Sequence, residues 1–216
     1  RWNSWKASLL DHLHTRTNEA LERGLDQPQQ QDEVIAQRQA EARIQLLKQG
    51  LDNEQLNLLW MSLSTDYFLQ NSVDAIIWHT GLLWPPGQQI DRHVAELRYD
   101  AAHRCTEIFV YGPDRDDLFA HTTALLGQLS LNVLGARIQT TAQSLSINSY
   151  LVLEDDGSQL EGPERLEGIR HFLQDGLNSA EPPQGGLRIP RQLQSFQVPS
   201  EISFEQDTNR MFTLLQ

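Results

Sequence analysis

Hydrophobic residues in roughly the first 90 positions recur at the spacing of amphipathic helices, and no strand pattern interrupts them. The expected helices cover 4–21, 32–50, 52–63 and 72–84. Asp32, Asp52 and Ser72 stand where N-caps are favoured, and Pro85–Pro86 should end the last helix. The pattern therefore predicts an all-helical N-terminal segment.

The pattern changes after residue 104, where short β-branched and aromatic runs alternate with helical ones. The expected strands are 105–112, 131–141, 146–157 and 194–206, and the expected helices are 116–130 and 163–178. The order βαββαβ is that of a ferredoxin-like unit, in which four antiparallel strands carry two helices on one face. The sequence predicts an α+β protein: a helical segment followed by a ferredoxin-like domain.

Composition narrows the function classes. The 216 residues include 39% hydrophobic and 21% charged ones, as in ordinary globular proteins. The net charge of −12 argues against nucleic-acid and anionic-membrane partners, and no apolar run approaches the roughly 18 residues of a membrane span. Cys105 is the single cysteine, which favours a reducing, cytoplasmic setting. From the start at Arg1 and the apolar end at 211–216 we expect a segment of a longer protein.

The stretch VYGPDRDDLF, 110–119, takes the chain directly from a strand into a helix. One interpretation is structural: Asp114 is an N-cap and Asp117 the third helical residue, each stabilising by on the order of 0.5–2 kcal/mol. The other is functional, because the free backbone N–H groups of such a turn can bind a carboxylate. The residues alone leave both interpretations open.

Several blocks together resemble one family. TEIFVYGPDRDDLFAHTTALLGQLSLNVLGARIQTT followed by SYLVLEDDG resembles the first of two tandem ACT domains in the bacterial bifunctional uridylyltransferase/uridylyl-removing enzymes. LWMSLSTDYFLQNSVDAIIWHT is similar to the helical segment before those domains. RQLQSFQVPSEISF resembles the end of the first ACT domain, and NRMFTLL the opening strand of the second.

The resemblance implies a division of the chain. Residues 1–104 would be helices on the C-terminal side of an HD region, 105–206 the first ACT domain, and 207–216 the truncated start of a second. The longer parent enzyme would attach UMP to the PII signalling protein when glutamine is scarce and remove it when glutamine is plentiful. The implied partners are glutamine, PII, the second ACT domain and the catalytic domains, with magnesium as the parent's cofactor.

Catalytic signatures of that family are missing from this sequence. The Gly157–Ser158 pair is not followed by the Asp-x-Asp of a nucleotidyltransferase, and no His-Asp dipeptide is present. The seven histidines lack metal-ligand spacing, so we interpret them as solvent-facing or hydrogen-bonded core residues. Cys105, at a strand start, is interpreted as a structural thiol. No catalytic residue, metal site or cofactor is therefore predicted within the chain itself.

The resemblance places the ligand at the strand-to-helix turn. The matching positions are Asp114, Arg115, Asp116, Asp117, Leu118 and Phe119. Many ACT domains have Pro-Gly where this chain has Asp116–Asp117, so two side chains would crowd the ligand and repel its carboxylate. The first unit is thus expected to bind glutamine weakly alone, with 135–137 (Gly-Ala-Arg) facing the second unit.

The leading hypothesis is a non-catalytic, glutamine-sensing regulatory segment that shifts the balance between two remote active sites. The alternative is an interaction module that joins domains or subunits without a ligand. A stand-alone enzyme is disfavoured, because the catalytic groups it needs were not found.

Overall fold

A computed structural model describes residues 28–85 and 90–179, the short stretches 204–207 and 212–215, and isolated helical positions before residue 28. The chain forms two compact units, 1–185 and 186–216. Most of the helix expected over 4–21 lies outside the described residues.

The helical segment contains four described helices: α2 (Pro28–Lys48), α3 (Asn53–Met61), α4 (Thr65–Gln70) and α5 (Val73–Leu82). Two predicted caps are confirmed: the Asp52 carboxylate and the Ser72 hydroxyl accept hydrogen bonds from the first turns of α3 and α5. The cap predicted at Asp32 is wrong, because α2 already begins at Pro28, a residue that suits a first helical turn.

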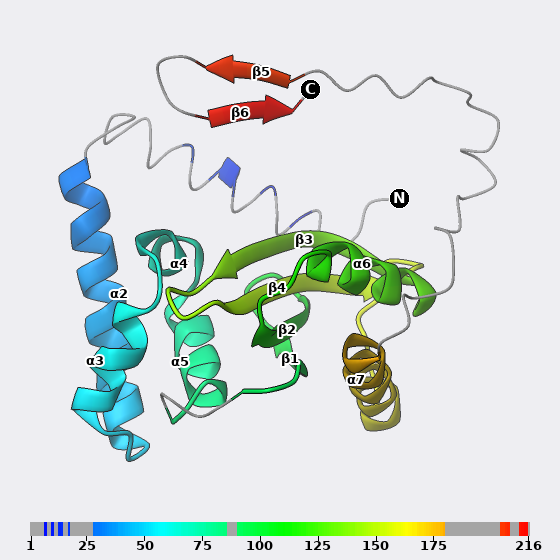
Figure 1. Ribbon diagram of the computed structural model, residues 1–216, viewed down its shortest axis with the longest axis horizontal. Coiled ribbons are helices and arrows are strands. Elements are labelled where there is room, and N and C mark those ends of the chain that lie inside the picture. Colours follow the sequence, from blue (N-terminus) through cyan, green and yellow to red (C-terminus); the bar gives the residue numbers. More distant parts are fainter. Residues whose placement is uncertain are drawn as a thin grey trace. The chain divides into compact units, whose positions relative to one another are not determined.

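The ferredoxin-like sheet is antiparallel throughout, with the strand order β1-β2-β4-β3 (Figure 1). Its elements are β1 (Val94–Asp100), β2 (Cys105–Pro113), α6 (Leu118–Gln128), β3 (Leu131–Thr140), β4 (Leu145–Glu154) and α7 (Pro163–Asn178). The helix predicted over 163–178 has these bounds, with its proline in the first turn. The α+β ferredoxin-like class is confirmed.

Strand β1 was not predicted. It lies within the range assigned to the helical segment and pairs antiparallel with β2. In a βαββαβ unit that position beside the first strand belongs to the fourth strand. The strand predicted over 194–206 has described residues only at 204–206; these belong to β5 (Phe204–Asp207), which pairs with β6 (Phe212–Leu215) in the second unit. A strand is thus confirmed at 204–206, but it pairs with β6, and among the described residues the place beside β2 is taken by β1.

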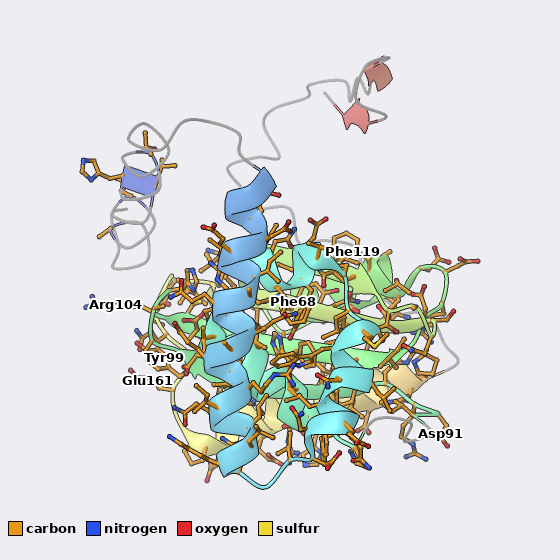
Figure 2. The ribbon with its side chains drawn as sticks, turned by 90° about the vertical axis from the view of Figure 1, so that its left-hand side faces the viewer. Phe68, Asp91, Tyr99, Arg104, Phe119 and Glu161 are labelled. Carbon is orange, nitrogen blue, oxygen red and sulfur yellow. The ribbon has the colours of Figure 1, made fainter. Side chains whose placement is uncertain are left out.

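The sheet is covered on both faces because side chains alternate along its strands. Ile108 and Val110 of β2 join a cluster with α6 and α7. Phe109 and Tyr111 join a cluster with the helical segment, which lies in front of the sheet in Figure 2. The helical segment and the sheet thus share one core, and the contact between them places the groups described next.

Candidate functional site

The predicted ligand turn is an exposed, charged loop. Residues 114–117 are exposed, whereas Leu118 is buried in the core beneath α6. Asp117 is the residue before α6; its φ of 66° is left-handed, and its side chain makes no capping hydrogen bond. The predicted roles of Asp114 as N-cap and Asp117 as third helical residue are therefore wrong.

Asp114 is held elsewhere. Its backbone N–H donates to the carbonyl of Ser144 at 2.9 Å, and its carboxylate accepts from the Thr140 hydroxyl at 3.2 Å. Both partners belong to the end of β3 or the turn between β3 and β4. These contacts hold Asp114 at that turn, so α6 begins at Leu118 instead of directly after Asp114.

Arg115 is bound to the helices behind the turn. A guanidinium N–H donates to Nδ1 of His121 at 3.3 Å, and Nε2 of His121 donates to the carbonyl of Gly176 at 3.0 Å. Phe119 is 49% exposed and stacks on Tyr150 at a ring distance of 6.5 Å. Of the six predicted positions, 114–117 lie together at the surface, Phe119 lies beside them half exposed, and Leu118 is part of the core.

The turn between β3 and β4 also contacts the helical segment. The N–H of Ala142 donates to the carbonyl of Ser62, directly after α3, at 3.2 Å. Together with the bond from Asp114 to Ser144, this forms a short hydrogen-bonded route from the predicted ligand turn to the helices. No sequence motif predicts this route, because its residues are of types that are common in turns. They become partners only when the helical segment packs against the sheet.

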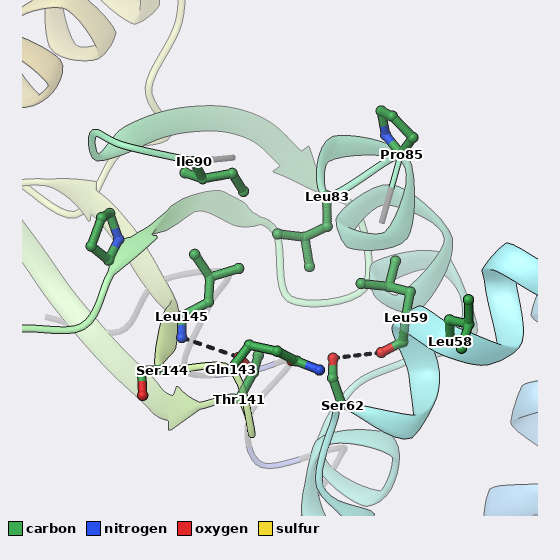
Figure 3. Close-up of a pocket in the computed structure, with 11 residues that line it drawn as sticks. Leu58, Leu59, Ser62, Leu83, Pro85, Ile90, Thr141, Gln143, Ser144 and Leu145 are labelled. Atoms are coloured by element: carbon green, nitrogen blue, oxygen red, sulfur yellow. Dashed lines mark hydrogen bonds between the residues drawn. The ribbon is translucent and has the colours of Figure 1, made fainter. Parts of the chain in front are cut away.

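A pocket of about 510 Å³ lies beside this route (Figure 3). Its apolar lining includes Leu59, Leu83 and Leu145. The Ser62 hydroxyl donates to the carbonyl of Leu59, and the Thr141 hydroxyl accepts from the N–H of Leu145. None of the described lining residues is charged. The pocket suits an uncharged group and does not offer the ion pairs that an amino-acid head group needs.

A buried polar chain crosses the contact between the helical segment and the sheet. It joins Tyr67 of α4, His79 of α5, Glu107 of β2 and Arg98 of β1. The distances are 3.1 Å from the tyrosine oxygen to Nδ1, 3.1 Å from Nε2 to Oε1, and 2.7 Å from the guanidinium to Oε2. Tyr67, His79 and Glu107 are at most 2% exposed, so water does not replace these contacts.

The protonation states follow from the surroundings. Burial would raise the pKa of Glu107, but the hydrogen bond from His79 and the charge and hydrogen bond of Arg98 outweigh it and hold the pKa at about 2. Burial lowers the pKa of His79, because Arg98 already neutralises the neighbouring carboxylate and a further proton would leave a buried positive charge. Burial raises the pKa of Tyr67. The tyrosine therefore donates to neutral His79, which donates to ionised Glu107.

Aromatic contacts fix the orientation of the side chains in this polar chain. The His79 ring stacks on Phe109 with centroids 4.0 Å apart, and the Arg98 guanidinium lies 4.7 Å from the Trp78 ring. The interpretation of histidines as hydrogen-bonded core residues is confirmed for His79. The polar chain was not predicted from the sequence. Glu107 is nevertheless a lone charged residue in the apolar run CTEIFVYG, and such a residue indicates a buried partner.

Within 28–85 and 90–179, no three His, Cys, Asp or Glu side chains are grouped to hold a metal ion. No helix in the same part of the chain is long and apolar enough to cross a membrane.

Fold and site define an α+β protein in which a helical segment is joined, through a buried polar chain, to one face of a ferredoxin-like sheet. Residues 30–82, which span nearly all of α2–α5, match the family described as Uridylyltransferase GlnD fifth domain. The whole chain is 36% identical over 223 residues to the bifunctional uridylyltransferase/uridylyl-removing enzyme of Pseudomonas putida, and 37% identical over 226 residues to that of Stutzerimonas stutzeri.

The chain belongs to the family of bifunctional uridylyltransferase/uridylyl-removing enzymes. Each alignment covers 100% of this chain but 24% of the relative, so the chain spans about a quarter of their length. The resemblance stated from the sequence motifs is thereby confirmed.

Proposed function

We propose that this chain is a non-catalytic regulatory segment of a parent enzyme that attaches UMP to PII and removes it, and that its sheet domain is an ACT domain contributing to glutamine sensing. One observation carries the proposal. The exposed turn at 114–117 is hydrogen-bonded, through the turn between β3 and β4, to the helical segment. A ligand bound at the surface turn would therefore be linked to the helices through backbone hydrogen bonds. Catalytic groups and their magnesium are proposed to lie in other parts of the cytoplasmic parent.

Glutamine carries an ammonium and a carboxylate, and the turn offers groups for both. Asp114 would accept from the ammonium, while Arg115 and backbone N–H groups in the first turn of α6, which have no side-chain cap, would bind the carboxylate. Arg115 would first have to exchange its bond to His121. Asp116 and Asp117 crowd the approach and add negative charge, so a second ACT domain would complete the site, facing residues 135–137.

Regulation requires that glutamine bind one arrangement of the segment more tightly than another. The contacts from Asp114 to Ser144 and from Ala142 to Ser62 would transmit the difference, because moving the surface turn displaces the end of α3. Helices α2–α5 would then pass the change to the catalytic domains and alter the balance between UMP transfer and removal.

The test is isothermal titration of the full parent enzyme with glutamine. We expect weaker binding for Asp114→Ala and for Arg115→Ala than for wild type. Asp155→Ala and Arg92→Ala remove exposed charges of the same kind elsewhere and serve as matched controls. Unchanged affinity in both turn variants would exclude the turn as a binding element.

The second candidate is an interaction module without a ligand. Leu58 and Met61 of α3 are 63% and 82% exposed, which favours contact with another domain. Under this alternative, wild-type parent enzyme gives no heat with glutamine, whereas Leu58→Ser with Met61→Ser weakens its assembly or lowers both activities. Under either candidate, the isolated chain neither transfers nor removes UMP.

A further inference from the structure

We propose that Glu107 is a positioning residue that holds the helical segment in one orientation on the sheet, and that this orientation is required for the glutamine response. The second part rests on the proposed function. Glu107 is the shared acceptor: its two oxygens accept from His79 of α5 and from Arg98 of β1. A single carboxylate thus joins the helical segment to two neighbouring strands.

The contacts specify direction as well as proximity. Nε2 of His79 lies 3.1 Å from one carboxylate oxygen, and Nε of Arg98 lies 2.9 Å from the other. The same guanidinium donates to the backbone carbonyl of Asp74, in the first turn of α5, at 3.2 Å. Helix α5 is therefore held at His79 and, through Arg98, near its start. A slide or rotation of α5 would break both connections.

An apolar contact would not have this selectivity. Leucine and phenylalanine side chains pack acceptably after small shifts, whereas a buried carboxylate that loses its donors is strongly disfavoured. Buried ion pairs add little net stability over apolar packing of the same volume, and a role in specifying one arrangement is their best-supported use. This polar chain lies where the helical segment meets the sheet, which is where one arrangement must be distinguished from another.

The polar chain also connects α5 to α4 and α2. Tyr67 of α4 donates to the opposite nitrogen of His79, and the carbonyls at the end of α4 accept from Arg38 of α2 at 2.7–3.0 Å. A change at Glu107 is thereby connected through α5 and α4 to α2. On the opposite face of the sheet, α6 and α7 pack through apolar side chains.

The experiment compares three variants of the full-length parent enzyme. Glu107→Gln removes the charge at nearly constant shape, and Tyr67→Phe removes only the far hydroxyl of the chain. Leu173→Ala is the matched control, because it weakens the core of the opposite face at a side chain that is fully buried. Hydrogen exchange is followed in α5 and in α7, and glutamine binding and the ratio of UMP removal to transfer are measured.

For Glu107→Gln we expect α5 to lose protection while α7 keeps it, and glutamine still to bind. The effect of glutamine on the activity ratio, roughly 5- to 150-fold for typical allosteric coupling, should fall to about twofold or less. Tyr67→Phe should produce a smaller loss of the same kind, and it keeps the test decisive if Glu107→Gln does not fold. Leu173→Ala should lose protection in α7 and keep the response.

Two results would overturn the inference: the same exchange pattern in Glu107→Gln and Leu173→Ala, or a full glutamine response after Glu107→Gln (or after Tyr67→Phe, should the first not fold). A wild-type enzyme without a glutamine response would instead contradict the proposed function. The comparison of α5 with α7 would still decide whether Glu107 holds the helical segment.

Discussion

The two faces of the sheet are packed by different means. Toward α6 and α7 the sheet presents aliphatic side chains such as Ile108, Val110 and Val152, which meet Ile169 and Leu173. Toward the helical segment the packing is also largely apolar, but a polar chain from Tyr67 to Arg98 runs through it. One strand, β2, contributes to both faces through the alternation of its side chains.

The difference separates two physical tasks. Aliphatic packing supplies stability roughly in proportion to the area buried, and it is tolerant of small shifts. A buried chain of hydrogen bonds is less tolerant, because each member depends on the position of the next. We therefore expect the α6–α7 face to stabilise the unit through buried apolar area and the other face to determine how the helical segment is oriented.

Glu107→Ala should have the largest effect on stability. It leaves Arg98 and His79 without their shared acceptor, and breaking a buried ion pair in this way costs about 3–5 kcal/mol. Urea unfolding of the chain measures the change in free energy. Glu96→Ala on neighbouring β1 is the control, since its pair with Arg170 is partly exposed and should contribute on the order of 0–1 kcal/mol. Equal losses in both variants would contradict the importance of burial.

Leu173→Ala on the other face should come next. Its side chain is fully buried, and truncating a buried leucine typically costs about 2–5 kcal/mol. Leu58→Ala is the control on α3, where the side chain is 63% exposed, and it should change the urea midpoint little. A negligible effect at Leu173 would mean that buried apolar area on the α6–α7 face does not stabilise the unit.

Acid should weaken the polar face by an intermediate amount. The folded-state pKa of Glu107 lies below its ordinary value, so its stabilisation is present above pH 4.5 and is lost as the pH falls toward about 2. The stabilisation that is lost is on the order of 3 kcal/mol. The pKa of His79 is also lowered, so protonation of the unfolded chain favours unfolding as the pH falls below 6.5.

The measurement is the free energy of unfolding from pH 7 to pH 3 for wild type and Glu107→Gln. The variant lacks the titrating carboxylate, and its curve should be flatter below pH 4.5. Parallel curves would argue against a contribution from this carboxyl group.

Tyr67→Phe should have the smallest effect of the series. It removes a donor and leaves Nδ1 of His79 buried without its partner, which costs about 1–3 kcal/mol. Tyr99→Phe is the matched control, because Tyr99 is 54% exposed and its hydroxyl contacts only a surface glutamine among the described residues. If the two variants unfold at the same urea concentration, the hydroxyl of Tyr67 does not stabilise the protein through the polar chain.

Local signals in the sequence predicted much of the fold. Asp52 and Ser72 were correctly assigned as helix caps, and Pro163 marked the start of α7. These features depend on neighbours within one helical turn, so they can be predicted from the local sequence alone. Strand β1 also has a local signal that was not among the predictions, because Ala95, Leu97 and Tyr99 alternate with charged residues.

By itself, then, the sequence determined the family, the α+β class and most element boundaries, since these depend on periodicity, caps and motifs close together along the chain. Tertiary structure decided the rest. In it, β1 pairs with β2, and Asp114 forms a hydrogen bond with Ser144 instead of capping α6. It also joined Tyr67, His79, Arg98 and Glu107, which become partners only when two helices and two strands meet. Hydrogen bonds between distant residues depend on relative position in space, which no local pattern encodes.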